Sequence, residues 1–511
     1  MDKKQELLKQ PNQLAIFFNQ LWMNIFVRPP QAIARFFVRL YHGIIKSSKR
    51  LWHSFSKGDL WVKLSVLFLG LGSFRRKQYT KGAIFTAFQL LYVLFMIFVG
   101  VPNISKLHNL GSVEYAVVYD PDLRENIVNN YDHSFLILLF SLLTIAFSVT
   151  YLVALVKNVN YQYGLQLKAQ NNEHIDTIKE DVKTLLDDKF HITLLALPIS
   201  GIVIFTIIPL VFMFLIAFTN YDEFHQPPIK LFTWVGLDNF QRLFDFGSQT
   251  SQFSYSFGVI IVWTLIWAFF ATFLNYIGGM ILALWINNKT IKWKRMWRTI
   301  FVITIAIPQF VSLLLVKNFF ASQGIVNQIA IQMGILDFLK SAGMVKAELA
   351  YIPFLTDPVW TRVMLILINC WIGFPYVMLI TTGVLLNIPQ DLYESARIDG
   401  ANRIQLFGKI TLPYMLFVTA PYLITNFIHN MNNFNVIYLL TYDRPTSDLS
   451  LAFVDARDVD LLVTWLFRLT AEQSNFKMAS TVGVILFLIS VVFTLLAFNQ
   501  TIKQNREETF Q

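Results

Sequence analysis

The chain is 511 residues long; 55% of its residues are hydrophobic, only 14% are charged, and the formal net charge is +10. A soluble domain carries roughly 25% charged residues, so this chain has too few to cover a water-facing surface. The composition excludes a soluble globular protein, a disordered chain and a fibrous repeat, and a single cysteine, Cys370, excludes a disulfide framework. We therefore expect a protein embedded in lipid.

The first predicted element is a basic amphipathic helix after Pro29-Pro30, since proline suits a helix's first turn. Basic and apolar residues alternate along it at spacings of three and four: Arg35, Arg39, His42, Lys46 and Lys49 against Ile33, Phe36, Phe37, Leu40 and Ile44. This pattern predicts a helix on the inner leaflet of a membrane, with docking to a protein as the alternative. The apolar piece Leu64 to Phe74 is too short to span and is predicted to be interfacial or re-entrant.

Eight uncharged apolar segments follow, each near the ~20 residues that cross the hydrocarbon of a bilayer. They lie near residues 83–101, 135–156, 192–218, 258–286, 299–316, 363–387, 414–440 and 480–500. We predict an all-α polytopic membrane protein with eight transmembrane helices. Residues 1–82 form a cytoplasmic amphipathic and interfacial arm, and residues 83–190 contain the first two spans and a cytoplasmic linker.

The basic residues between the spans predict the orientation of the chain. Assigned alternately, the termini and the loops on their side hold 30 of the 42 lysines and arginines. By the positive-inside rule, both termini are expected in the cytoplasm. The positive charge is thus explained by membrane flanks, and we expect no binding to nucleic acid.

The spans contain no Asp, Glu, Lys or Arg, and His429 is the one clear histidine within them. Carriers driven by protons or sodium generally need ionisable groups at membrane depth, so a secondary transporter is disfavoured. The sequence also lacks a zinc-protease motif, a nucleophile elbow and a phosphate-binding loop. We expect no enzyme, no metal and no cofactor, and any ATP must be hydrolysed by a partner.

The loop 386–413 is predicted to form two short helices across the membrane face. Pro389 suits the first turn of the first helix, Gly400 permits the left-handed turn that ends it, and Asn402 can cap the second. A rigid element of this kind can transmit movement to the spans on either side of it.

Spaced residues in this loop resemble the EAA loop of ABC importer permeases. The matching positions are Glu394, Ser395, Ala396, Gly400, Ile410, Leu412 and Pro413, with Ser395 in place of an alanine. In that family, the loop inserts into a separate ATP-binding subunit. The resemblance implies that these residues couple the chain to an ATPase, and that residues 191–511 form a permease domain with the six-helix core of a type I importer.

Neighbouring stretches, Asn369 to Tyr376 and Asn430 to Thr441, resemble the MalF-type permeases of maltose and maltodextrin importers. The resemblance implies a bacterial cytoplasmic membrane location, an oligosaccharide substrate and four further chains. These are a second, MalG-like permease subunit, two ATP-binding cassette subunits and an extracytoplasmic sugar-binding protein. Gram-negative MalF proteins have a large external insertion after the third span, where this chain has only residues 219–257.

Spans six and seven contain asparagines that are costly in lipid unless they find partners. Asn426, Asn430 and Asn433 are spaced for one helical face, as are Asn369, Gly373 and Tyr376. Such faces suit a neutral sugar, or equally join helices by hydrogen bonds. The MalF resemblance implies a sugar site at Asn369, Ile372, Gly373, Tyr376, Val377, Asn426, Asn430 and Asn433, with Ile305 and Gln309 departing from the family's Tyr and Ser.

Two alternatives remain open from the sequence. One is the same architecture with another cargo, such as a galacto-oligosaccharide, a raffinose-type sugar, multiple sugars or glycerol phosphate. The other is a polytopic membrane glycosyltransferase, which should show acidic clusters at the membrane edge. The dense candidates are Asp455, Asp458 and Asp460, which we expect instead to form a solvated surface or one that faces the binding protein.

Overall fold

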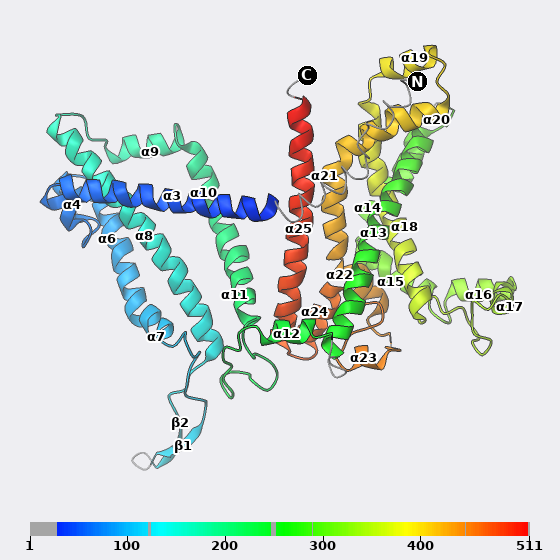
Figure 1. Ribbon diagram of the computed structural model, residues 1–511, viewed down its shortest axis with the longest axis horizontal. Helices are drawn as coiled ribbons and strands as arrows, with labels where there is room; N and C mark the ends of the chain where they lie inside the picture. Colours follow the sequence, from blue (N-terminus) through cyan, green and yellow to red (C-terminus); the bar gives the residue numbers. More distant parts are fainter. Residues whose placement is uncertain (1–27, 121–123, 247–251, 289, 445, 509–511) are drawn as a thin grey trace, which may run out of the picture. The chain divides into compact units, whose positions relative to one another are not determined.

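The computed structural model describes residues 28–120, 124–246, 252–288, 290–444 and 446–508. The chain forms two compact units, Met1–Gly236 and Leu237–Gln511. Helices dominate both units, as the predicted all-α fold class requires (Figure 1). The described residues also contain one two-stranded sheet. The division between the units falls after the third predicted span, and the predicted boundaries at residues 82 and 190 stay predictions.

The first unit contains three helices long and apolar enough to span a membrane: Tyr79–Ile104, Ser134–Gln170 and Phe190–Ile216. They correspond to the first three predicted spans. The elements in chain order are α3 (Arg28–Lys57), α4 (Leu60–Leu64), α5 (Leu71–Arg75), α6 (Tyr79–Phe95), η2 (Met96–Gly100), α7 (Val101–Ile104), β1 (Val117–Asp120), β2 (Glu125–Val128), α8 (Ser134–Gln170), α9 (Ile178–Leu186), α10 (Phe190–Ile202), η3 (Val203–Ile207) and α11 (Ile208–Ile216).

Helix α3 is the predicted amphipathic helix, and it crosses α8 within the first unit (Figure 1). Ser54 donates a hydrogen bond to Asn160 over 2.8 Å at this crossing. The side chains of Arg35, Arg39, His42, Lys46 and Lys49 are exposed. The side chains of Ile33, Phe36, Phe37 and Leu40 lie outside the described residues. Its place on a membrane surface stays a prediction. The piece from Leu64 to Phe74 does not form a span; α4 ends and α5 begins within it, as expected of a non-spanning segment.

A β-hairpin separates the first two spans, with Val117 of β1 opposite Val128 of β2. Asp132 holds its base, accepting hydrogen bonds from the backbone of Ser112 (2.9 Å) and Val113 (3.3 Å) and pairing with Lys106 at 2.6 Å. Burial raises the pKa of Asp132, but its bonds with Lys106 and the two backbone groups outweigh burial, so the pKa lies below its ordinary value.

The second unit contains four candidate spans besides one bent helix pair: Gln252–Asn287, Pro358–Leu386, Arg403–Thr441 and Phe476–Leu495. They correspond to predicted spans four, six, seven and eight. The elements are α12 (Asp238–Phe244), α13 (Gln252–Asn287), α14 (Lys294–Ala306), α15 (Gln309–Phe319), α16 (Ile325–Gln332), α17 (Ile335–Ser341), α18 (Pro358–Leu386), α19 (Gln390–Ile398), α20 (Arg403–Leu406), η4 (Phe407–Thr411), α21 (Leu412–Met431), α22 (Phe434–Thr441), α23 (Leu449–Ala452), α24 (Leu462–Ala471) and α25 (Phe476–Glu508).

The fifth predicted span is broken. Helices α14 and α15 meet at an angle of 94°, so the prediction of one continuous helix over residues 299–316 is wrong. The break lies at Ile307 and Pro308, where Ile307 has extended backbone angles. Proline lacks a backbone N–H and disfavours a helical residue before it, which explains the position of the break. The described residues thus hold seven candidate spans, or eight if the bent pair is one span.

Helix α13 packs along both α18 and α21, and this packing positions the polar residues of the second unit (Figure 1). Glycines allow the close approach of α13 to α18. A Cβ added to Gly278 would overlap the ring of Phe374, and one added to Gly279 would overlap Val377. Small residues at helix crossings are typical of packing in membranes, where dispersion contacts and interhelical hydrogen bonds drive association.

Candidate functional site

Helix α18 carries the first predicted polar face. Asp357 caps its N-terminus by accepting hydrogen bonds from the backbone of Val359 and Trp360, and Pro358 occupies the first turn. Along the predicted face, Asn369 is buried, Gly373 is half-buried and the ring of Tyr376 is 52% exposed. The two other expected site residues of α18 differ in exposure. Ile372 is half-buried and Val377 is buried.

Helix α21 carries only part of the second predicted face. Asn426 is half-buried and Asn430 is buried, but α21 ends at Met431. The Asn433 side chain caps the next helix, α22, by accepting a hydrogen bond from the backbone N–H of Val436 over 3.2 Å. The prediction of one helical face for all three asparagines is therefore wrong at Asn433. Asparagine side chains compete with helical backbone bonds, which explains the interruption.

Helix α13 contributes polar residues that the sequence analysis missed. Asn430 donates a hydrogen bond to Thr272 over 2.9 Å, and the hydroxyl groups of Tyr276 and Thr419 are 2.7 Å apart. The carboxamide of Asn275 lies against Gly373 of α18, at the place where a Cβ would stand. The sequence did contain a signal for this polar face, because Thr272 and Asn275 lie three residues apart within the fourth predicted span.

The groups on these three helices are amides and hydroxyls with an aromatic ring beside them. They are uncharged hydrogen-bond donors and acceptors, so they can bind a neutral polar ligand without burying an unpaired charge. An aromatic ring such as that of Tyr376 can cover the apolar face of such a ligand.

The predicted pair of short helices in the loop 386–413 is present as α19 and α20. Gly400 adopts φ +82°, and Asn402 forms a reciprocal capping box with Gln405. The hydroxyls of Tyr393 and Thr411 hydrogen-bond over 2.9 Å, which joins α19 to the base of the seventh span. The sequence folds this way locally because glycine accepts the left-handed turn and asparagine satisfies the free backbone donors of α20.

This loop presents apolar side chains to its surroundings. Ile398 is 86% exposed and Ile404 is 82% exposed, on either side of the Gly400 turn. The expected coupling residues lie along the same loop: Glu394, Ser395, Gly400 and Pro413 are exposed, and Ala396, Ile410 and Leu412 are half-buried. Exposed apolar groups on a rigid turn are typical of a surface that a partner covers.

Comparison with known proteins gives the family. Residues 275–505 match the family of binding-protein-dependent transport system inner membrane components. The maltodextrin transport system permease protein MalC of Streptococcus pneumoniae is 34% identical over 84% of this chain and 93% of its own length. The chain belongs to this family of ABC importer permeases.

Two relatives from Bacillus subtilis match a similarly large share of the permease. The maltodextrin permease MdxF is 34% identical over 89% of the permease and 99% of its own length. The galactooligosaccharides permease GanP is 33% identical, over 86% and 96% respectively. The permease is therefore a multi-pass membrane component of a transporter and not an enzyme, which rules out the glycosyltransferase alternative.

The acidic residues that we expected to be solvated are mostly buried. Asp458 pairs with Arg444 at 3.3 Å, and Asp460 pairs with Arg468 at 3.2 Å. The prediction of a solvated surface is therefore wrong at Asp458 and Asp460, while Asp455 is half-buried. Burial raises the pKa of Asp460, and the adjacent Arg468 opposes this effect. Arg444, just after α22, and Arg468, in α24, allow these carboxylates to be buried.

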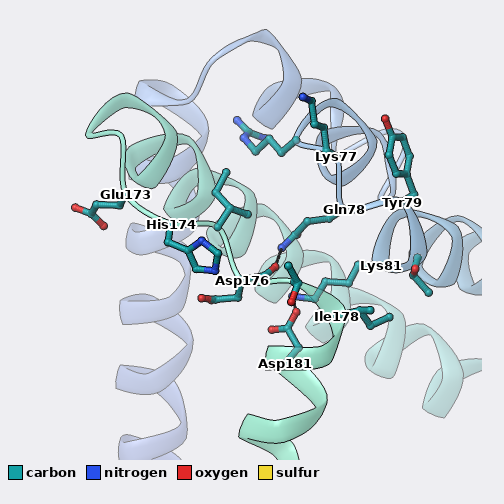
Figure 2. A pocket seen from close by; sticks show the side chains of 13 residues that line it. Lys77, Gln78, Tyr79, Lys81, Glu173, His174, Asp176, Ile178 and Asp181 are labelled. Atoms are coloured by element: carbon teal, nitrogen blue, oxygen red, sulfur yellow. Dashed lines mark hydrogen bonds and ion pairs between the residues drawn. The ribbon is translucent and has the colours of Figure 1, made fainter.

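The first unit of the permease contains a cavity of about 630 Å³ between the start of α6 and the segment before α9. Figure 2 shows several polar side chains that line it, among them Gln78, which donates a hydrogen bond to the backbone carbonyl of Asp176 over 3.0 Å. Lys81 pairs with Asp181 on the same wall. Hydrogen bonds from Thr177, with a smaller effect of His174, lower the pKa of Glu180 to about 2. The contacts of Gln78 and Lys81 tie the predicted linker to the start of the first span.

Proposed function

We propose that the permease carries a neutral oligosaccharide, of the maltodextrin class, into the cytoplasm. The observation that carries this proposal is its similarity to MalC and MdxF, at 34% identity over nearly the full length of each protein. Transport would be driven by two ATP-binding cassette subunits, with a second, MalG-like permease subunit and an extracytoplasmic sugar-binding protein. Both termini would then face the cytoplasm, as the distribution of basic residues predicts.

The uncharged polar groups of the second unit support a sugar as the cargo. The proposed substrate-binding residues are Asn369, Ile372, Gly373, Tyr376, Val377, Asn426, Asn430 and Asn433. Amides can both donate to and accept from sugar hydroxyls, and Tyr376 offers an exposed ring for the apolar face of a pyranose. Asn430 and Asn433 would act partly through the structures they hold, since one bonds to Thr272 and the other caps α22.

The loop 386–413 is the proposed contact with the ATPase. Its short helices, the turn at Gly400 and the exposed Ile398 and Ile404 suit insertion into a cleft of an ATP-binding subunit. Movement of that subunit would reach the seventh span through the bond between Tyr393 and Thr411. This path would couple ATP hydrolysis to a change in access to the cargo site.

A galacto-oligosaccharide is the second candidate cargo. GanP is 33% identical to the permease, almost as similar as the two maltodextrin permeases. Both cargoes are neutral and rich in hydroxyls, so the uncharged lining suits either one.

Transport by the assembled complex separates the two cargoes. The permease would be reconstituted in liposomes with its partner permease, ATPase and binding protein, and the uptake of labelled maltotriose would be measured. We expect ATP-dependent uptake of labelled maltotriose. Unlabelled maltotetraose should inhibit this uptake by competition, whereas unlabelled galactotriose should not. Uptake of labelled galactotriose without uptake of maltotriose would contradict the maltodextrin assignment.

A further inference from the structure

Two buried amides on α13 and α18 each have a hydrogen-bonding atom without a partner. Among the described residues, Oδ1 of Asn275 accepts no hydrogen bond and Nδ2 of Asn369 donates none. Both side chains are more than nine-tenths buried, since each residue is 6% exposed. Burying an amide atom without a partner is unfavourable, and such atoms in a native protein call for an explanation.

Gly373 allows the side chain of Asn275, on α13, to reach the face of α18 that carries Asn369. It follows Asn369 by four residues, so both lie on one face of the helix. A Cβ on Gly373 would overlap the Oδ1, Nδ2 and Cγ atoms of Asn275. The missing side chain at residue 373 therefore makes room for the carboxamide of Asn275.

Neighbouring polar residues of α13 have partners on other helices. Thr272 accepts from Asn430, and Tyr276 bonds to Thr419, so these two residues join α13 to α21. Asn275 differs because its side-chain oxygen, Oδ1, accepts no hydrogen bond from the described residues of the packed helices. A purely structural interhelical amide would be expected to use this atom within the protein.

We propose that Asn275 is a further specificity-determining residue of the cargo site, which recognises hydroxyl groups of the sugar together with Asn369. This inference rests on the proposed function and extends the site to a third helix. A sugar O–H would donate to Oδ1 of Asn275, and a hydroxyl oxygen would accept from Nδ2 of Asn369. Because a hydroxyl both donates and accepts, it matches either orientation of the two amides.

Transport of modified sugars tests the proposal. The complete complex would be assembled with the Asn275→Ala and Asn275→Ser variants and given the oligosaccharide that the wild type transports, or analogues lacking one hydroxyl each. The binding protein would be kept saturated with each sugar, so that the remaining discrimination between sugars belongs to the permease. Asn287→Ala is the matched control, because Asn287 lies on the same helix and donates to Ala283 and Thr382 within the protein.

We expect the wild type to transport one deoxy analogue about three- to tenfold more slowly than the parent sugar, the equivalent of one lost neutral hydrogen bond. The Asn275→Ala variant should transport the parent sugar more slowly by a similar factor and should no longer distinguish that analogue. The Asn275→Ser variant, which keeps a hydroxyl, should be intermediate. The Asn287→Ala control should keep the wild-type discrimination.

Two results would overturn the proposal. One is that Asn275→Ala discriminates among the analogues as the wild type does, which would also be the result if Asn275 bound only water. The other is that both Asn275 variants fail to assemble with the partner subunits, which would assign the residue to helix packing. The proposed function is judged separately on the wild type, because a wild type that takes galactotriose contradicts the maltodextrin assignment and still allows the test of Asn275.

Discussion

The side-chain amide of Asn430 on α21 donates a hydrogen bond to the hydroxyl of Thr272 on α13, over 2.9 Å. The backbone carbonyl of Asn430 also accepts a hydrogen bond from the indole of Trp267, over 3.0 Å. Asn430 is therefore fixed by α13 from both its side chain and its backbone. For this asparagine, the interhelical interpretation and the sugar-binding one are complementary, because an amide held in place from one side can present its remaining acceptor to a ligand.

Removing the hydroxyl of Thr272 should destabilise the permease. In Thr272→Val the shape is kept, but the buried Asn430 amide loses its acceptor, which should cost about 1–3 kcal/mol. Thermal unfolding of the purified permease in detergent measures the loss. Thr304→Val is the control, since the exposed Thr304 hydroxyl donates to the backbone carbonyl of Phe301 in its own helix and not to another span among the described residues. Equal effects of both substitutions would contradict the structural role of the bond.

A β-branched residue at position 400 should uncouple ATP hydrolysis from transport. Gly400 has φ +82°, and side chains with a Cβ are strained in this region by roughly 1–2 kcal/mol. We expect Gly400→Val to lower uptake while basal ATPase activity continues, as measured on the reconstituted complex. Gly400→Asn should retain most coupling, because asparagine tolerates the left-handed region. Full coupled transport by Gly400→Val would refute the role of this turn.

Polar substitutions of Ile398 and Ile404 should weaken binding of the ATPase. Burying an isoleucine side chain contributes about 1.5–3 kcal/mol, so each change to serine should raise the Kd by about ten- to a hundredfold. Titration of the purified ATPase subunit against the permease measures this effect. Leu449→Ser is the control, because Leu449 is 79% exposed and lies in the segment between the seventh and eighth spans. Unchanged binding by both isoleucine variants would place the ATPase elsewhere.

The carboxylate of Asp132 should contribute stability that depends on pH. Its pKa in the folded protein lies below the ordinary value of 3.8, so its contribution is present above pH 3.8 and is lost as the pH falls through the lower, folded value. Asp132→Asn should lower the free energy of unfolding by about 1–3 kcal/mol at neutral pH. Thermal unfolding as a function of pH should show this difference closing in acid.

Glu125→Gln serves as the control for this pH dependence, because Glu125 is an exposed residue of β2. It should unfold like the wild type at every pH. A difference between Asp132→Asn and the wild type that is constant with pH would contradict the proposed ionic contribution.

The spans and the coupling loop were predictable because their causes are local. A membrane helix requires only an uninterrupted apolar stretch of sufficient length, and the turn at Gly400 requires only a glycine followed by the Asn402 cap. The break at Pro308 was also visible in the sequence, since proline there disfavours a helical Ile307. The two wrong predictions about helix continuity, at Pro308 and at Asn433, arose because apolar length alone does not locate such local breaks.

Other features depend on residues that are distant in the chain. The amide of Asn430 requires the hydroxyl of Thr272 on another span, and the position of Asn275 requires the absence of a side chain at Gly373 on another span. A polar residue is read as exposed, structural or ligand-binding according to the partners that reach it, and those partners are set by how the helices pack. The sequence by itself determined the membrane architecture, its expected orientation and the family. Only the tertiary structure decided which polar groups are already paired and which two amide atoms remain unpaired beside Gly373.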